Sequence, residues 1–369
     1  MKIALITIHQ SNNYGAVLQA YATKKILSKY GTVETINYDN KFLLHHLDMF
    51  RFALSIRGLK MLTHDILRFP YRYKAVSRFR NFVKDNMNLT KKLTSQELAE
   101  GKVNDFNLYV CGSDQIWNPK IVNPDIKVDP IFFLSFAPKK SKKISYASSI
   151  GSYVFSETEK NQIKNLLKDF TMISTREIDG QKKLSEILPN KEIYHVLDPT
   201  LLLSKDEWIE KLDIKITNQS YEKYILLYTV PRTSLIKKAV EYFATKLELK
   251  VIAIDQMFFP ITKVDKHIKN AGPKEFIELF ANAEFIITDS FHGTCFAINF
   301  EKQFVSISPG KSANRIKSLL SKLDIEERMI CDESEFDKLP LNFDYSHISK
   351  KLSSIREESL YFIEESIDK

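Results

Sequence analysis

The chain has 369 residues, more than one compact α/β domain needs, so we expect two domains. Its composition, 44% hydrophobic and 27% charged, is that of an ordinary globular protein and shows no sign of disorder. The net charge of +8 fits an anionic substrate, an acidic membrane surface or nucleic acid. No motif that reads nucleic acid accompanies the charge, so we expect no nucleic-acid partner.

The three cysteines, Cys111, Cys295 and Cys331, form no pair at metal-ligand spacing. Their odd number indicates a reducing compartment rather than a disulfide framework. No apolar run approaches the roughly 18 residues that a membrane-spanning helix needs. Residues 1–10 lack a small-residue cleavage site and are typical of a first strand. We therefore expect a cytoplasmic protein that binds no metal.

Short apolar runs alternate with helical patterns in the first part of the chain. The predicted strands are 2–8, 33–38, 108–111, 143–147 and 172–174, and the predicted helices are 16–29, 157–170 and 177–188. Basic and aromatic residues interleave between 51 and 92. This pattern is typical of an amphipathic helical excursion with a solvated basic face. The alternative is docking on anionic lipid or on a lipid-linked substrate.

A second series begins after a change of character near residues 198–200. A helix at 205–212 and a polar linker at 214–223 lead into it. The predicted strands are 224–230, 250–254, 284–288 and 304–307, and the predicted helices are 234–247, 273–282, 294–300, 315–323 and 349–366. This alternation predicts mostly parallel sheets that are covered on both faces.

The fold class is therefore α/β, with two Rossmann-like domains and a cleft between them. The first domain is expected at 1–213, with a basic helical insertion at about 42–100, and the second at 222–345. A helix at 346–369 is expected to pack back on the first domain.

Ligands in open α/β sheets bind outside the carboxyl ends of the strands, so polar residues there are candidates for a site. Asn13, Tyr14 and Gly15 follow the first strand. Backbone N–H groups at this helix start could meet an anion or sugar hydroxyls. A plain turn with an asparagine cap explains the same residues equally well.

Asp114, Gln115 and Trp117 follow the strand at 108–111. Their polar groups and indole face are typical of carbohydrate binding. The alternative is a capped loop with a packed tryptophan.

Arg176 lies between the strand at 172–174 and the next helix. A guanidinium there can clamp a carboxylate or phosphate bidentately. It could instead pair with Glu177 or Asp179.

The segment from Asp289 to Gly293 is the strongest candidate. An apolar strand delivers Asp289, Ser290 and His292 into a turn that Gly293 relieves, and a helix follows. His292 can act as a general acid or base near neutral pH, and the helix start offers N–H groups to phosphate. Lys311 and Arg315, after the next strand, favour an anion clamp.

These segments together resemble the polysaccharide pyruvyl transferase family. The resemblance rests on the ordered motifs at 112–119, 174–177, 198–202 and 289–293, together with 13–16 and 314–315, and covers about residues 10–330. It implies a two-domain fold like that of the GT-B glycosyltransferases. It also implies phosphoenolpyruvate as co-substrate, no other cofactor, and a sugar acceptor on a surface-polysaccharide precursor. That acceptor is expected to be a lipid-linked oligosaccharide, with peripheral contact at the cytoplasmic membrane face.

The resemblance also assigns roles to residues. It implies catalytic roles for His292 and Arg176. It implies donor binding by Ser290, Gly293, Lys311, Asn314 and Arg315, and acceptor binding by Asn13, Tyr14, Gly15, Asp114, Gln115 and Trp117. The main rival is a GT-B glycosyltransferase with a nucleotide-sugar donor. A non-enzymatic polysaccharide-binding or assembly protein is the other.

Overall fold

The computed structural model describes residues 1–47, 56–216 and 223–369. Within these ranges it does not describe the side chains of His46, His64, Lys311 and residues 56–61. The chain divides into two compact units. Unit 1 comprises Met1–His46, Val83–Leu202 and Leu352–Lys369, and unit 2 comprises Leu47–Phe82 and Leu203–Lys351.

These ranges differ from the predicted domains in two places. The middle segment of unit 1 ends at Leu202, so the helix at Lys205–Leu212 belongs to unit 2. Two long helices, α3 (Ile56–Asn86) and α13 (Ser346–Asp368), contribute residues to both units. Among the described residues, no helix is long and apolar enough to cross a membrane.

Unit 1 is built on a parallel sheet of six strands. Their order is β2-β1-β3-β4-β5-β6, at Thr32–Thr35, Lys2–Ile6, Leu108–Cys111, Lys142–Ser148, Met172–Thr175 and Ile193–His195. The strands are short, apolar and almost entirely buried, as expected when helices cover both faces of a parallel sheet. The chain passes from β1 to β2 on one side and returns to β3 on the other.

The helices that lie within unit 1 all begin at a side-chain N-cap except the last, whose N-cap residue Glu177 makes no capping bond. They are α1 (Tyr14–Leu27), α2 (Lys41–Leu44), α4 (Ser95–Ala99), α5 (Pro119–Val122), α6 (Glu157–Leu167) and α7 (Ile178–Ile187). Ser156 and Glu159 form a capping box at the start of α6. The end of α13 packs on this unit, where Phe362 lies 6.2 Å from the ring of Tyr146.

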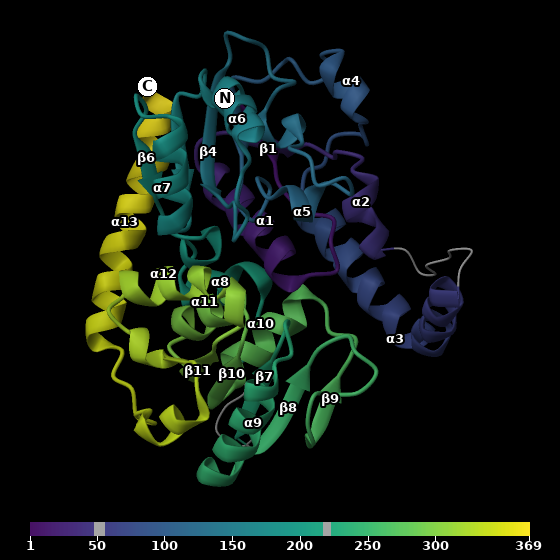
Figure 1. The fold of residues 1–369 in the computed structure, drawn as a ribbon, viewed down its shortest axis with the longest axis vertical. Helices are drawn as coiled ribbons and strands as arrows, with labels where there is room; N and C mark the ends of the chain where they lie inside the picture. Colours follow the sequence, from purple (N-terminus) through teal and green to yellow (C-terminus); the bar gives the residue numbers. More distant parts are fainter. Residues whose placement is uncertain (48–55, 217–222) are drawn as a thin grey trace. The chain divides into compact units, whose positions relative to one another are not determined.

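Unit 2 holds a second parallel sheet of six strands. Their order is β12-β11-β10-β7-β8-β9, at Met329–Ile330, Gln303–Ile307, Phe285–Thr288, Tyr224–Tyr228, Lys250–Ile254 and Lys266–Ile268 (Figure 1). The chain runs outward from β7 through β8 to β9 and then starts again at β10, on the other side of β7. The junction of β7 and β10 is therefore the topological switch point, where ligands bind in such sheets.

Helices cover the second sheet. They are α8 (Lys205–Leu212), α9 (Ser234–Leu247), α10 (Pro273–Asn282), α11 (Phe291–Asn299) and α12 (Asn314–Lys322). Phe243 of α9 stacks on Phe285 of β10, with ring centroids 5.5 Å apart. Phe276 of α10 lies edge-on to Tyr228 of β7 at 4.9 Å. The strands between them are thereby buried, and their carboxyl ends are held in place.

The two six-stranded parallel sheets confirm the predicted α/β fold class with two Rossmann-like parts. The predicted helices at 205–212, 234–247 and 273–282 match the observed bounds. Three short strands, β6, β9 and β12, were not predicted. With only two or three residues each, they carry too little alternation to be distinguished from loop.

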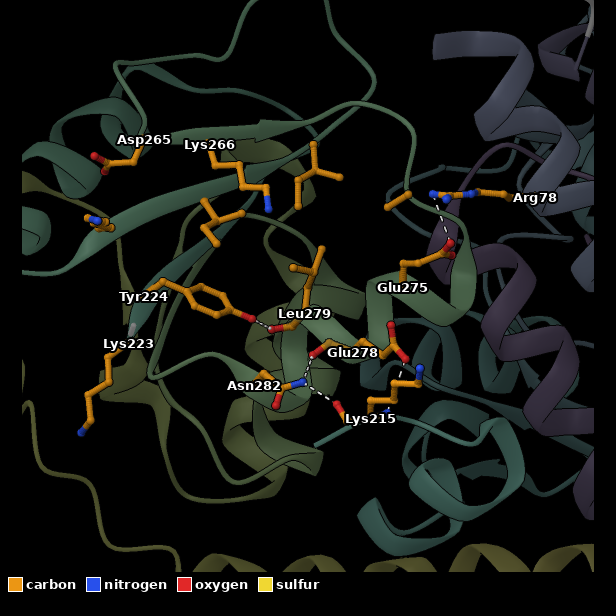
Figure 2. A pocket seen from close by; sticks show the side chains of 14 residues that line it. Arg78, Lys215, Lys223, Tyr224, Asp265, Lys266, Glu275, Glu278, Leu279 and Asn282 are labelled. Atoms are coloured by element: carbon orange, nitrogen blue, oxygen red, sulfur yellow. Dashed lines mark hydrogen bonds and ion pairs between the residues drawn. The ribbon is translucent and has the colours of Figure 1, made fainter. Parts of the chain in front are cut away.

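An open pocket of about 1020 Å³ lies at the amino ends of β7, β8 and β9. It is lined by Tyr224, Lys250 and Lys266, the first residues of these strands. Figure 2 shows Arg78 paired with Glu275 on its wall, at 3.1 Å. Charges of both signs line the pocket, and the opposite ends of the strands carry the candidate motif. It is therefore not the candidate active site.

Candidate active site

The switch point of unit 2 brings two loops together. Thr288, the last residue of β10, pairs in register with Tyr228, the last residue of β7. The chain beyond Tyr228 enters the loop before α9, and the chain beyond Thr288 enters the start of α11. Residues far apart in the sequence therefore meet at one edge of the sheet.

Asp289 holds these two loops to each other. Its carboxylate accepts the hydroxyl of Thr229 at 2.7 Å and the backbone N–H groups of Val230 at 2.7 Å and Arg232 at 3.0 Å. Burial raises the pKa of Asp289, although these donors act in the opposite direction. The side chain therefore shapes the β7–α9 loop.

Ser290 is the N-cap of α11, and His292 lies in the first turn of that helix. The prediction of a loop at this point is wrong, because the helix begins at Phe291 and not at Thr294. The Ser290 hydroxyl accepts the Gly293 N–H at 3.4 Å, a long and weak bond. His292 is buried, and its ring lies edge-on to that of Phe291, with centroids 5.2 Å apart.

Gly293 serves close packing rather than a turn. It lies inside α11, and a Cβ there would come within 2.2 Å of Thr288 Oγ1 and 3.0 Å of Tyr228 Cδ1. Without a side chain, the helix approaches the ends of β7 and β10 closely. The first turn of α11 is thereby placed at the switch point.

Arg315 supplies positive charge near this turn. Its guanidinium lies 5.8 Å from the ring centroid of Phe291, within the range of a cation–π contact. Asn314 is exposed and begins α12. The side chain of Lys311 lies outside the described residues, so its predicted donor contact stays a prediction.

The end of β8 adds an ion pair that the sequence motifs did not reveal. Asp255 accepts from Arg232 Nη1 at 2.9 Å and lies 3.0 Å from His267 Nε2. Burial opposes ionisation of Asp255, but its hydrogen bonds with His267 and with the Met257 N–H, together with the charge of Arg232, outweigh burial and lower its pKa. The only sequence signal for these residues was their position: Arg232 lies just after β7, Asp255 directly after β8, and His267 in β9.

At the carboxyl edge of unit 1, Arg176 forms a buried ion-pair cluster. Its Nη1 donates to Asp198 at 2.7 Å, its Nε to Glu177 at 3.0 Å and its Nη2 to Asp114 at 3.0 Å. Burial alone would lower the pKa of Arg176, but the three carboxylates outweigh it and raise the pKa. The pairing with Glu177, one of the alternatives, is present. A contact with the donor stays a prediction.

The role predicted for Trp117 is wrong. Its side chain is only 1% exposed, stacks on Phe133 at 5.1 Å and donates its N–H to the Phe132 carbonyl at 3.0 Å. No face is left for a sugar ring, so Trp117 is a core residue. Gln115 accepts the side-chain N–H of Asn118 at 2.9 Å and is partly buried.

The loop before α1 contains the asparagine cap that one of its two interpretations predicted. Asn13 is the exposed N-cap, and its side chain accepts the Ala16 N–H at 3.2 Å. Tyr14 and Gly15 are buried within the first turn. Acceptor binding by these three residues stays a prediction.

His9 follows β1 at the switch point of unit 1, and the sequence motifs assigned it no role. It is 4% exposed, and its Nδ1 lies 3.0 Å from the Thr7 carbonyl oxygen. Its buried Nε2 has no hydrogen-bond partner among the described residues. Burial lowers the pKa of His9 to about 4, so the ring is neutral near pH 7. When Nδ1 donates to Thr7, Nε2 is a hydrogen-bond acceptor.

Solved structures share the fold of this chain. One is a mutant of an O-GlcNAc transferase from Thermobaculum terrenum, with 9% identity and a TM-score of 0.51 over 100% of this chain and 66% of that chain. Another is a UDP-GlcNAc 2-epimerase from Neisseria meningitidis bound to UDP-GlcNAc, with 10% identity and a TM-score of 0.51 over 99% of both chains. At such low identity the likeness shows the fold alone, which is of the GT-B type.

No curated protein matches the sequence significantly. The family model for polysaccharide pyruvyl transferase matches residues 13–311, which include the exits of β3, β5 and β10. The match covers most of the chain and agrees with the resemblance of the motifs. The chain therefore belongs to the polysaccharide pyruvyl transferase family.

Proposed function

We propose that the protein transfers the enolpyruvyl group of phosphoenolpyruvate to a sugar of a surface-polysaccharide precursor. Two hydroxyls of the sugar become a pyruvate ketal, and phosphate is released. The observation that carries the proposal is the position of His292, in the first turn of α11 at the β7–β10 switch point, with Arg315 near Phe291.

The reaction needs an acid. Protonation of C3 of the enol ester makes C2 electrophilic, so that a sugar hydroxyl can add there. Phosphate then leaves, and a second hydroxyl closes the ketal. We assign the proton donation to His292, because this histidine lies in the first turn of α11, two residues after Ser290. Histidine is the residue type that most often serves as a general acid in enzymes.

The donor is doubly charged at its phosphate and carries a carboxylate. Arg315, Lys311 and Asn314 follow β11, and Ser290 and the Gly293 backbone belong to α11. A helix N-terminus and cations favour an anion, and they stabilise phosphate as it leaves. We assign the donor to this edge of unit 2.

The acceptor is assigned to the carboxyl edge of unit 1. His9 Nε2 can accept a hydrogen bond from a sugar hydroxyl, because the neutral ring is held by Thr7. Asn13, Asp114 and Gln115 are the polar residues proposed to surround it. Arg176 keeps the loop of Asp114 in place, and we retain its donor contact as a proposal.

One assay tests this function. Purified protein, labelled phosphoenolpyruvate and acceptors ending in galactose, glucose or N-acetylmannosamine are combined, and phosphate release and label transfer are measured. We expect phosphate and transferred label in equal amounts with at least one lipid-linked acceptor. Inertness across the whole panel would overturn the proposal.

A binding measurement separates the main rival. A ligand that binds only the native state raises the unfolding temperature. At a ligand concentration a hundred times its dissociation constant, the free energy of unfolding rises by about 2.7 kcal/mol. We expect protection by phosphoenolpyruvate and none by uridine diphosphate. Protection by the nucleotide alone would favour a glycosyltransferase with a nucleotide-sugar donor.

A further inference from the structure

In unit 2, helix α3 leaves large apolar side chains uncovered. Leu67 is 67% exposed and Tyr73 is 57% exposed, and Ile66 and Tyr71 are about half exposed. The same stretch buries Val76 and Phe79, at 0% and 1% exposure. A helix that only packs on a core hides its apolar stripe and turns polar residues outward. This stretch of α3 instead carries a second, outward-facing apolar stripe.

A second segment of unit 2 continues this surface. In the loop between β8 and β9, Phe259 is 71% exposed and lies edge-on to Phe258 at 4.7 Å. Lys269 Nζ lies 5.3 Å from the ring centroid of Tyr71 and 5.1 Å from that of Phe258. One cation therefore joins the helix to the loop. We call the surface formed by residues 66–74, 257–259 and Lys269 the aromatic–basic surface.

The charge of the aromatic–basic surface has one sign. Residues 66–74 contain Arg68, Arg72 and Lys74 and no acid. The nearest acid on α3, Asp65, is 0% exposed. Arg232 Nη2 donates to the Phe259 carbonyl at 3.0 Å and holds the aromatic loop in position.

We propose that the aromatic–basic surface docks the protein peripherally on a bilayer of anionic phospholipid. Tyrosine and phenylalanine rings partition into the interfacial region of a membrane, while lysine and arginine reach its anionic headgroups. An anionic leaflet attracts such cations, so each cation near its surface strengthens binding several-fold. The proposal does not depend on pyruvyl transfer.

Charge favours a bilayer over a second copy of the chain. Two copies joined through this surface would bring its cations against each other, which is unfavourable when few acids face them. An anionic bilayer instead complements the whole surface. Clusters of exposed large apolar side chains also mark interaction sites.

Sedimentation with vesicles tests the proposal on the full chain. We expect binding to vesicles of phosphatidylcholine with phosphatidylglycerol, little binding to phosphatidylcholine alone, and weakening by salt. Phe259→Asp should lower the partition coefficient at least about tenfold, and Lys74→Gln about fivefold. The matched control is Val154→Asp, since Val154 is 77% exposed in unit 1, and it should bind as the wild type does.

Fluorescence then locates the contact. Both tryptophans, Trp117 and Trp208, are buried, so they report little on lipid. A new tryptophan in Phe259→Trp should be quenched by brominated phosphatidylcholine in anionic vesicles, whereas Val154→Trp should not be quenched. The Phe259→Trp variant keeps an aromatic side chain, so it tests the contact in a folded protein even if Phe259→Asp loses binding through misfolding.

Three results would overturn the proposal. The first is that the wild type fails to bind anionic vesicles. The second is binding that Phe259→Asp leaves unchanged, with no quenching of Phe259→Trp, because another face would then make the contact. The third is a dimer in analytical ultracentrifugation that Phe259→Asp dissociates, because the surface would then join two copies.

Discussion

The guanidinium of Arg176 donates to the carboxylate of Asp198 across 2.7 Å, and both side chains are 0% exposed. Glu177 and Asp114 accept from its other nitrogens, so one side chain joins the loop after β3 to the segments after β5 and β6. Glu177 in turn accepts the Ser149 hydroxyl at 2.6 Å, which adds the exit of β4. The carboxyl edge of unit 1 is thus organised around a single cation.

Removing this cation should destabilise unit 1. In Arg176→Met the buried carboxylates of Glu177 and Asp198 would lose their partner, which costs roughly 3–5 kcal/mol. We expect a clearly lower midpoint of thermal unfolding, measured by circular dichroism. The control is Lys160→Met, which removes an exposed ion pair with Glu157 and should leave the midpoint unchanged.

The same residue is also proposed to contact the donor. Arg176→Lys keeps the positive charge but loses the planar guanidinium, which can bind an anion through two N–H groups. Asp198→Asn weakens the ion-pair cluster but leaves the guanidinium unchanged. If Arg176 binds the donor, the Arg176→Lys variant should lose protection by phosphoenolpyruvate, while the Asp198→Asn variant retains it. Each variant is compared with its own unliganded midpoint of unfolding. Equal protection in the two variants would leave Arg176 with a structural role only.

Gly293→Ala should disturb the start of α11. The new Cβ would lie 2.2 Å from Thr288 Oγ1, and overpacking of this kind costs about 1–3 kcal/mol. Thr288→Ala removes that oxygen, together with its hydrogen bond to the Tyr228 carbonyl. The double variant should therefore lose less stability than the sum of the two single changes, by urea denaturation. Strict additivity would show that the helix moves away instead.

The sequence predicted best what is encoded locally. The helices at 205–212 and 234–247 have hydrophobic periodicity, and Ser204 and Thr233 stand at their N-caps, so their bounds could be read directly. The strand at 108–111 was equally clear, because it is a short apolar run followed by a glycine. The parallel arrangement followed from the alternation of strands and helices.

Contacts between residues far apart in the sequence could not be predicted. Trp117 follows a strand in a polar motif, and nothing nearby shows that Phe132 and Phe133 pack against it. Arg176 pairs with Asp114 and Asp198, which lie 62 and 22 residues away. One local signal was missed: Ser290, three residues before Gly293, is a usual N-cap and moves the start of α11 to include His292.

Stability should depend on pH through His9. Burial lowers its pKa from 6.5 to about 4, so between these values the unfolded chain binds a proton that the folded chain does not. The contribution of the neutral His9 to the free energy of unfolding is therefore complete above about pH 6.5. It is lost as the pH falls towards 4, by roughly 3 kcal/mol in total. The midpoint of unfolding, measured across this range, should fall less steeply in His9→Gln.

The exposed His347 provides the control for His9. His347→Gln should keep the pH dependence of the wild type. If His9→Gln also keeps it, the loss of stability in acid comes from other groups. Loss of acceptor binding in His9→Gln with unchanged protection by phosphoenolpyruvate would in addition support the proposed contact of Nε2 with a sugar hydroxyl.

His292→Gln separates proton donation from donor binding. Glutamine continues the first turn of α11 and retains hydrogen-bonding atoms, but its amide cannot protonate carbon. Loss of a general acid typically slows a reaction by about 10²–10⁴-fold, so we expect phosphate release to fall by that factor. Thermal protection by phosphoenolpyruvate should remain, because Arg315 and the helix start are unchanged. Cys295→Ser, one turn further along the same buried helix, controls for a general disturbance of α11 and should retain most of the activity. Wild-type turnover in His292→Gln would exclude His292 as the acid.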